Sequence, residues 1–303
     1  MKRVIVNADD FGLHPAVTAG ILRAAELGMI SSTTVSANTC RRDDLMLLKA
    51  SGLACGLHLN LVEGRPLTGQ QGLEPILDGQ GQFQGVARLA AAITLRRIEL
   101  SRLWDEVRAQ AAVLADAGVE IDHFDSHRHA HLLPGVSDLV VRIAQETGVA
   151  AVRISREPLD FAPHMARATV KRLLILPFAR TASRKFANQG LRTPNSFFGI
   201  AILEPDDQFA LLRSILPRLS EGTTEIALHL ADVTALDSDA PSLMRWARNL
   251  EGLRKMDLPK ALAEAGAVLS TYADIDSAVL KAITAEHVHR QPPAPKPIRK
   301  EVK

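Results

Sequence analysis

The sequence predicts an α/β protein, a distorted (β/α) barrel with a metal site at the ends of its strands. Strand-like and helix-like segments alternate along most of the 303 residues. About seven strands fall within roughly 270 residues, which fits one barrel better than two domains. Polar side chains that can bind a metal follow several of these strands, at the edge of a parallel sheet where barrel active sites form.

The first elements are short apolar strands separated by helices. Residues 4–7 are rich in Val and Ile and end at two Asp residues, so we expect a buried strand. The next helix has Pro15 in its first turn, places Val17, Ile21 and Ala24 on one face, and ends at Gly28. A strand at 33–37, a helix at 43–50 and a strand at 54–61 follow.

The clearest helical pattern covers residues 100–114. Its apolar side chains recur at intervals of three and four, and Gly118 can end the helix: Leu100, Leu103, Trp104, Val107, Ala111 and Leu114. Beyond it we expect strands at 120–126, 150–154, 225–230 and 267–272. Helices are expected at 136–146, 206–216 and 243–265.

Two stretches interrupt this alternation. Residues 64–84 are rich in Gly, Gln and Pro and indicate a long loop. Residues 157–200 are basic and irregular, which suggests an inserted irregular segment beside the barrel. We therefore expect one domain over residues 1–284, with this insertion, and a basic, Pro-rich, disordered tail over 285–303.

Composition excludes several classes of protein. With 47% hydrophobic and 23% charged residues the chain can bury a full core, which excludes a disordered chain. An aromatic content of 4% and a net charge of +2 argue against a nucleic-acid partner. Two Cys residues outside a CxxC pattern, and the absence of a long apolar run, predict a cytoplasmic protein without a transmembrane segment.

Two strand ends carry groups that suit a metal site. Asp9 and Asp10 follow the first strand, where adjacent carboxylates are costly to bury unless a cation neutralises them. Their alternative reading is a helix cap beside a solvated carboxylate. Strand alternation places His58 and Asn60 on one face of the third strand, although a lone His there is more often a hydrogen-bonded core residue.

The strongest pattern is the segment 123–131. Asp125, His127, His129 and His131 alternate, so they share a face for as long as the strand lasts. Clustered imidazoles suit zinc or another divalent ion, and Asp125 could be a ligand or could orient one. The alternative is a chance cluster of surface side chains.

Two later residues complete the set. His229 follows a late strand and taken alone could equally be a buried structural His. Arg153 could hold an oxyanion or a substrate, or could be an ordinary surface Arg. Two His and one Asp would leave open positions on a metal, with a carboxylate and a His available as base and acid, so the expected chemistry is metal-assisted hydrolysis.

Four segments of the chain carry a family resemblance: NADDFGL at 7–13, GLHLNLVEGRPL at 56–67, DHFDSHRHAHLLP at 122–134 and VRISREP at 152–158. In order and spacing they resemble the YdjC-type carbohydrate deacetylases, with their ChbG group of chitooligosaccharide deacetylases and HpnK group of hopanoid-associated deacetylases. The resemblance covers residues 3–275 and implies a distorted barrel that removes the N-acetyl group of an amino sugar with one divalent metal ion, zinc or magnesium. Asp–His–His ligation suits zinc better than magnesium.

The resemblance also implies roles for single residues. Asp10, His58 and His127 would bind the metal, and Asp9 would be the general base. His229 would be the general acid, although Leu230 and Ala231 stand where the family usually has Pro-Gly. His129 and His131 would support the ligands or face the substrate, as would Asp125 and Asn60, and Arg153 would position Asp9. The substrate would be an acetylated oligosaccharide or a lipid-linked sugar such as a hopanoid glycolipid, with contact to a membrane surface, and the family suggests a homodimer.

Two other functions remain open at this point. One is a metal-dependent hydrolase of a different bond, a phosphoester or a cyclic amide. The other is a non-catalytic barrel that binds a sugar or a lipid. Asp9 beside Asp10 argues against the second, because binding alone does not need a base next to the metal.

Overall fold

Seven strands form one curled sheet in the computed structural model, which describes residues 1–162, 164–202, 208–235 and 240–275. Their order is β4-β3-β2-β1-β6-β5, with β7 also paired to β1, and every pair is parallel. The strands are β1 (Lys2–Phe11), β2 (Ser32–Val35), β3 (Ala54–Leu59), β4 (His123–Ser126), β5 (Ser196–Phe198), β6 (Gly222–Leu228) and β7 (Ala267–Leu269).

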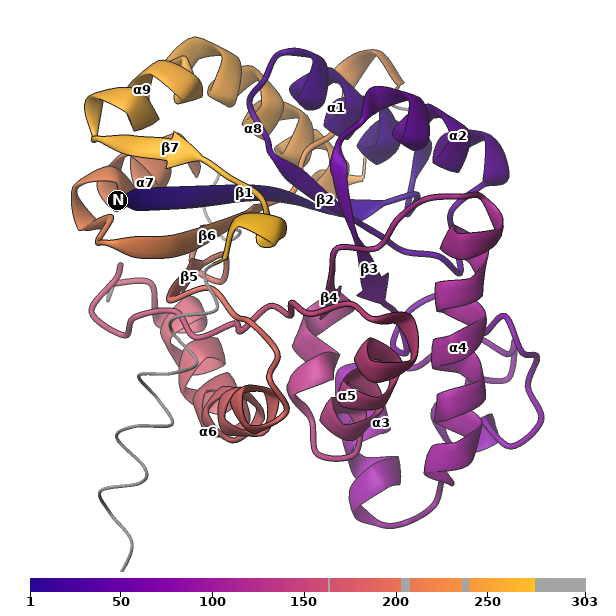
Figure 1. Ribbon diagram of the computed structural model, residues 1–303. Helices are drawn as coiled ribbons and strands as arrows, with labels where there is room; N and C mark the ends of the chain where they lie inside the picture. Colours follow the sequence, from indigo (N-terminus) through magenta and orange to yellow (C-terminus); the bar gives the residue numbers. More distant parts are fainter. Residues whose placement is uncertain (163, 203–207, 236–239, 276–303) are drawn as a thin grey trace, which may run out of the picture.

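Helices lie on the outside of this curled sheet (Figure 1). They are α1 (Pro15–Glu26), α2 (Arg42–Ser51), α3 (Gly85–Thr94), α4 (Leu100–Asp116), α5 (Val136–Thr147), α6 (Ala166–Asn188), α7 (Gln208–Ile215), α8 (Pro241–Met256) and α9 (Leu258–Glu264). The predicted α/β barrel class is confirmed, in the form of a curled half-barrel. No helix among the described residues is long and apolar enough to cross a membrane.

The two faces of the sheet have opposite character. Along β1, Val4, Val6 and Ala8 pack against the helices in the main apolar core, while Asn7 and Asp9 alternate with them and point into the curl. Isolated bridges from Phe124 to Val152 and from Ala151 to Arg192 extend the sheet beyond β4 toward β5. The curl therefore encloses a space whose lining differs from the apolar core outside it.

The interior of the curl is polar, where a closed barrel usually packs branched apolar side chains. Arg153 and Glu225 are fully buried there. The ring of His123 stacks on that of Tyr272, with ring centroids 3.6 Å apart. Gly56 leaves room for this stack, because a Cβ at that position would lie 2.4 Å from the ring of His123. Buried charge of this kind has to be matched by partners inside the curl.

Some element predictions were wrong. The segment 157–200 is not irregular, because it contains α6 and β5. The buried face of α6 is made mostly of Ala and does not form a visible apolar stripe: Ala168, Arg172, Ala179, Ala182 and Phe186. The helix expected at 243–265 is two helices, α8 and α9, because Asp257 adopts a left-handed conformation (φ 51°) between them. Helix α3 was not predicted, and residues 150–154 form only the isolated bridges. The tail expected over 285–303 lies outside the described residues.

Candidate functional site

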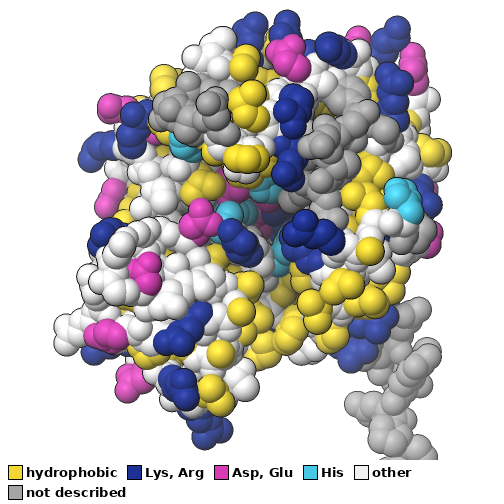
Figure 2. Space-filling view, turned by 180° about the vertical axis from the view of Figure 1, so that it is seen from behind, with side chains coloured by type: hydrophobic (Ala, Val, Ile, Leu, Met, Phe, Trp, Pro, Cys, Tyr) yellow, Lys and Arg dark blue, Asp and Glu magenta, His cyan; other side chains and the backbone are white. Residues whose placement is uncertain are grey.

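The carboxyl ends of β1, β3, β4 and β6 meet at one edge of the sheet and surround a cavity of about 310 Å³. Figure 2 shows a hollow with His and acidic side chains inside it and Lys and Arg around its mouth. The cavity wall contains most of the residues expected from the sequence, together with others: Asp9, Asp10, Leu13, His58, Glu63, Ser126, His127, Arg128, His129, Lys171, Phe197, Gly199, Ala227, His229, Ser242 and Trp246.

The end of β1 delivers two adjacent carboxylates to this cavity. Neighbouring strand residues ordinarily point to opposite faces. Here the register shifts between Ala8 and Phe11, and Asp10 takes a left-handed conformation with φ 71°. That backbone geometry is unfavourable for a residue other than Gly and turns Asp10 to the same side as Asp9. Helix α1 is instead capped by the side chain of His14, so the helix-cap reading of Asp10 is wrong.

Three imidazole rings surround the carboxylate of Asp10. His127 Nδ1 lies 2.8 Å and His58 Nε2 lies 3.1 Å from its Oδ1, and His229 Nε2 lies 3.0 Å from its Oδ2. Although Asp10 is fully buried, its Oδ2 has no hydrogen bond of good geometry among the described residues. A buried carboxylate oxygen in this state is suited to bind a cation.

The donor atoms of Asp10, His58 and His127 lie within 4.8 Å of one another, and all three residues are buried. The distal nitrogens are also held. His58 Nδ1 lies 2.7 Å from Asp125 Oδ1, and His127 Nε2 lies 3.0 Å from Glu63 Oε2. Carboxylates on the far nitrogens of ligating His residues fix the tautomer and the ring orientation in metal sites. This chain therefore fits a divalent cation with one carboxylate and two imidazole ligands.

The charges of the site residues also fit a bound cation. Burial would lower the pKa of His58, but Asp125 and Asp10 raise it to about 10. Burial likewise opposes Asp10 and Glu63, which raise the pKa of His127 to about 9. In the opposite direction, the surrounding imidazoles hold the pKa of Asp10 well below its ordinary value despite its burial. Without a metal, both rings would carry protons at neutral pH, in the place that a cation would take.

Arg153 is the cation at the centre of the curl. Its guanidinium donates to both oxygens of Asp9, at 2.7 and 2.8 Å, and contacts Asp125 at 2.5 Å. It also donates from Nε to Glu225 at 2.7 Å. Burial would raise the pKa of Asp9, but Arg153 lowers it far below its ordinary value. Arg153 is fully buried and is not among the cavity-lining residues, so the surface reading of this residue is wrong.

A second group of possible ligands, Asp9, His58 and Asp125, lies beside the first. Two of its members already share the guanidinium of Arg153. His58 uses Nδ1 toward this group and Nε2 toward Asp10. Because Arg153 neutralises the second group, Asp10, His58 and His127 form the better cation site.

The shared face expected for the 123–131 cluster is wrong beyond Ser126. The strand ends there, and Arg128 and His129 take left-handed conformations within a 3-10 segment, with φ 54° and 59°. His131 consequently points away from the cavity and bonds to Ser126 Oγ and the carbonyl of Arg153. Burial lowers the pKa of His131 to about 4. His129 lines the cavity wall and lies 2.8 Å from Ser155 Oγ.

Asn60 is buried and organises a loop. Its Oδ1 accepts hydrogen bonds from the backbone N–H groups of Val62 and Glu63, and it does not line the cavity. The loop after β3 thereby brings the Glu63 side chain to His127. Asn60 acts on the site through Glu63.

His229 lies just past β6, with its Nε2 beside Asp10 Oδ2. Its ring centroid is 4.8 Å from that of Trp246, and its Nδ1 has no hydrogen-bond partner among the described residues. Leu230 and Ala231 follow it, and Asn249 Nδ2 donates to the carbonyl of His229 at 2.9 Å. This hydrogen bond from α8 holds the His in place.

Sequence reasoning missed several residues at this site. Glu63 and Trp246 lie on connecting or helical segments with no local pattern to mark them, although Glu63 falls within the motif at 56–67. Thr34 Oγ1, 3.1 Å from His58 Nδ1, could have been found by strand alternation, since it is an inward position of β2. Glu225 could have been found in the same way on β6.

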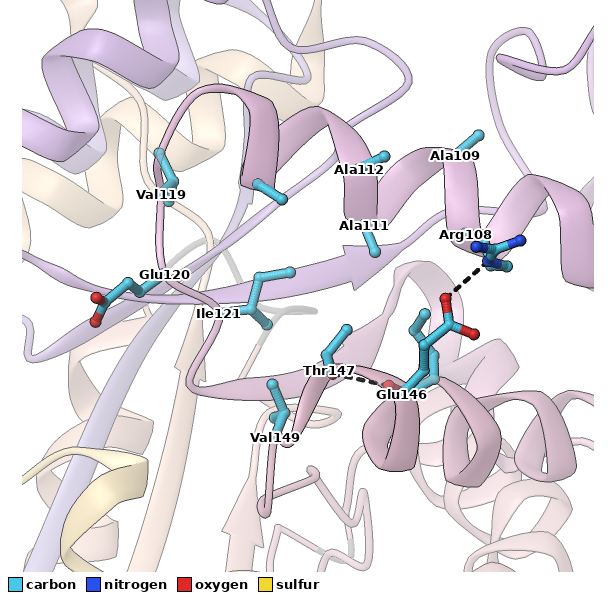
Figure 3. Close-up of a pocket in the computed structure, with 12 residues that line it drawn as sticks. Arg108, Ala109, Ala111, Ala112, Val119, Glu120, Ile121, Glu146, Thr147 and Val149 are labelled. Carbon is cyan, nitrogen blue, oxygen red and sulfur yellow. Dashed lines mark hydrogen bonds and ion pairs between the residues drawn. The ribbon is translucent and has the colours of Figure 1, made fainter.

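A larger cavity, of about 730 Å³, lies between α4 and α5 (Figure 3). Its wall is mostly Ala, Val and Ile, and Arg108 pairs with Glu146 at 2.8 Å across it. It holds no group of convergent catalytic side chains. The cavity at the strand ends is therefore the candidate site.

Known proteins resemble this chain over most of its length. The family described as YdjC-like protein matches residues 3–264. A human carbohydrate deacetylase is 30% identical over 233 residues, 73% of this chain and 70% of that protein. A chitooligosaccharide deacetylase of Citrobacter koseri is 30% identical over 282 residues, 90% of this chain and 99% of that protein. A crystal structure of an Enterococcus faecalis V583 protein, named for cellobiose-phosphate cleavage, matches this chain with a TM-score of 0.68 at 24% identity. The match covers 90% of this chain and 98% of that one, so the two proteins share the fold.

Proposed function

This chain belongs to the YdjC-like family, and we propose on that basis and on its site geometry that it removes the N-acetyl group of an acetylated amino sugar, releasing acetate. The observation that carries the proposal is the pair of adjacent carboxylates with different surroundings. Asp10 is contacted by three imidazoles, whereas Asp9 is held by Arg153. Two carboxyl groups in unlike environments can take different roles in hydrolysis. The names of the two relatives above, both deacetylases, support the same reaction.

Asp10, His58 and His127 would hold one divalent cation. The mixed carboxylate and imidazole donors favour zinc or a similar ion over magnesium. Once bound, such a cation would lower the pKa of a water molecule and polarise the acetyl carbonyl group. Asp125 and Glu63 would keep the two imidazoles oriented toward it.

Asp9 would be the general base. Arg153 holds the pKa of Asp9 far below its ordinary value, so the carboxylate is ionised throughout the neutral range, as a proton acceptor must be. Two hydrogen bonds from Arg153 and one from Asn7 Nδ2 fix its plane before substrate arrives. Arg153 is thus a positioning residue, which acts through Asp9.

His229 would be the general acid. An amine leaves poorly unless it is protonated, so cleavage of the amide needs a proton donor near the nitrogen. His229 lines the cavity, and its Nε2 lies 3.0 Å from Asp10 Oδ2. Its imidazolium would supply the proton that the leaving amine needs.

The test is acetate release from N-acetylated substrates. Purified protein would be assayed with N-acetylglucosamine oligosaccharides and, separately, with lipid-linked acetylated amino sugars, before and after chelation and after return of zinc or magnesium. We expect acetate release that is lost on chelation and restored by a divalent ion, and the two substrate arms separate a free sugar from a glycolipid. Phosphate release from phosphoesters without acetate release, or a fully metal-loaded protein that turns over neither substrate, would refute the proposal in favour of another hydrolase or a binding protein.

A further inference from the structure

Helix α6 exposes an apolar strip to solvent. Four of its large apolar side chains are at least two-fifths exposed: Val170 (56%), Leu173 (52%), Leu174 (67%) and Phe178 (40%). Their spacing of three, one and four residues places them on one side of the helix, which we call the α6 outer strip. The buried positions Ala168, Ala179 and Phe186 lie on the opposite side.

Contacts on its inner side hold α6 against the protein. The buried side chain of Arg172 donates to the carbonyl of Pro158 at 2.9 Å and to the carbonyl of Phe161. Near the other end, Lys185 Nζ contacts Asp138 Oδ1 of α5 at 2.5 Å. Because α6 is packed against the protein on its other side, the α6 outer strip is a surface of the folded protein and not an unpacked core face.

All the charge on α6 is positive. The helix has six basic residues and no acidic one, and no acidic residue occurs anywhere between 161 and 203. Arg167, Arg180 and Arg184 are exposed on either side of the α6 outer strip along the helix. Apolar side chains between exposed basic ones are typical of helices that lie in the surface of an anionic membrane.

The charge also argues against a second copy of the chain on this strip. A symmetric dimer through α6 would bring together eight exposed basic residues, namely Arg167, Lys171, Arg180 and Arg184 of each copy, without an acidic residue of α6 to balance them. The partner must combine an apolar interior with a negative surface.

We propose that the α6 outer strip docks the protein onto an anionic lipid bilayer. Lys171, on the same helix, lines the cavity of the candidate site, so docking through α6 would hold the cavity mouth close to the lipid surface. In Figure 2 hydrophobic side chains gather directly below the hollow, on the side of the molecule where α6 lies. This binding does not depend on the reaction proposed above.

Vesicle flotation of the full chain tests the proposal. The vesicles would be pure phosphatidylcholine, or phosphatidylcholine mixed with phosphatidylglycerol. Wild type is expected to float with the anionic vesicles, less so at high salt, and not with the neutral ones. The variant Leu173→Ser/Leu174→Ser/Phe178→Ser should bind at least about tenfold more weakly, because each side chain loses its apolar burial.

A matched control is available on α2, where Met46 and Leu47 are 50% and 54% exposed. The variant Met46→Ser/Leu47→Ser should bind like wild type. Circular dichroism verifies that each variant is folded. Acetate release from a soluble sugar shows separately whether the reaction occurs. Failure of wild type to float, equal weakening in both variants, or a dimer that the α6 substitutions dissociate would each overturn the proposal.

Discussion

Replacing Arg153 with Met is the sharpest test of the interior of the curl. Among the described residues Arg153 contacts three carboxylates, those of Asp9, Asp125 and Glu225, at 2.5–2.8 Å, and all four groups are buried. Removing one partner from a buried ion pair costs about 3–5 kcal/mol, because the other charge is left uncompensated. With three carboxylates affected, we expect Arg153→Met to lower the free energy of unfolding by about 4–5 kcal/mol at neutral pH.

The loss should depend on pH in a defined direction. In wild type the pKa of Asp9 is lowered by Arg153, so its stabilising contribution is present above the ordinary Asp value and disappears as pH falls through the folded value. Without Arg153 the buried carboxyl groups take up protons at a higher pH. The difference in unfolding free energy between wild type and Arg153→Met should therefore shrink as pH is lowered from about 7 to about 5.

Urea denaturation in the presence of a chelator measures this difference without a contribution from metal. Arg153→Lys keeps the charge and should lose less stability than Arg153→Met. Glu225 offers a second control, because burial raises its pKa and makes its ionised form costly. Adding Glu225→Gln to Arg153→Met should recover part of the loss by removing one uncompensated charge. A cost of less than about 1 kcal/mol for Arg153→Met, typical of a surface pair, would refute this account of the interior.

Three further outcomes are expected at the site. His127→Ala should lose the bound metal, whereas Asp9→Asn should keep it and lose about 100-fold or more in turnover; metal analysis that finds both variants equally loaded would contradict this division of roles. Binding of a divalent ion near neutral pH should release protons, because the pKa values of His58 and His127 are about 10 and about 9 without metal, and metal affinity should rise as pH approaches 9. Calorimetry in buffers of different ionisation enthalpy measures the number of protons released. Zero proton release would count against these ligands. Glu63→Gln should weaken metal affinity by about 10–100-fold through His127, and an unchanged affinity would show that Glu63 does not orient that ring.

Strand periodicity predicted most of the fold because the sheet is parallel and covered by helices. The first β–α–β units, the α4 stripe and β6 all have apolar patterns that need no long-range information. Helix α6 was missed because its buried face has three Ala, a single Phe and one Arg, and the burial of this Arg depends on carbonyl groups contributed by residues 158–162. The local sequence pattern does not reveal that carbonyl groups from another segment will accept hydrogen bonds from this Arg.

The site was predictable where a strand end alone decides the position. His58 follows from strand alternation and faces the interior of the curl, and Asp9 lies at the end of the first strand as expected. Asp10 violates that alternation, and its place depends on the left-handed backbone at φ 71°, which its side-chain type does not reveal. The predicted position of His131 was wrong for a related reason, because the backbone leaves the strand conformation after Ser126.

The contacts of Arg153 also set an order for biosynthesis. They join positions 9, 125, 153 and 225 of the chain, and β6, which carries the last of these, pairs directly with β1 in the middle of the sheet. A nascent chain that has not yet emerged past residue 225 thus has β2 on one side of its first strand but lacks β6 on the other, and it lacks the complete set of partners for its central cation. The ribosome must release most of the polypeptide before this interior can close, and fragments truncated before β6 should remain substrates for chaperones and proteases.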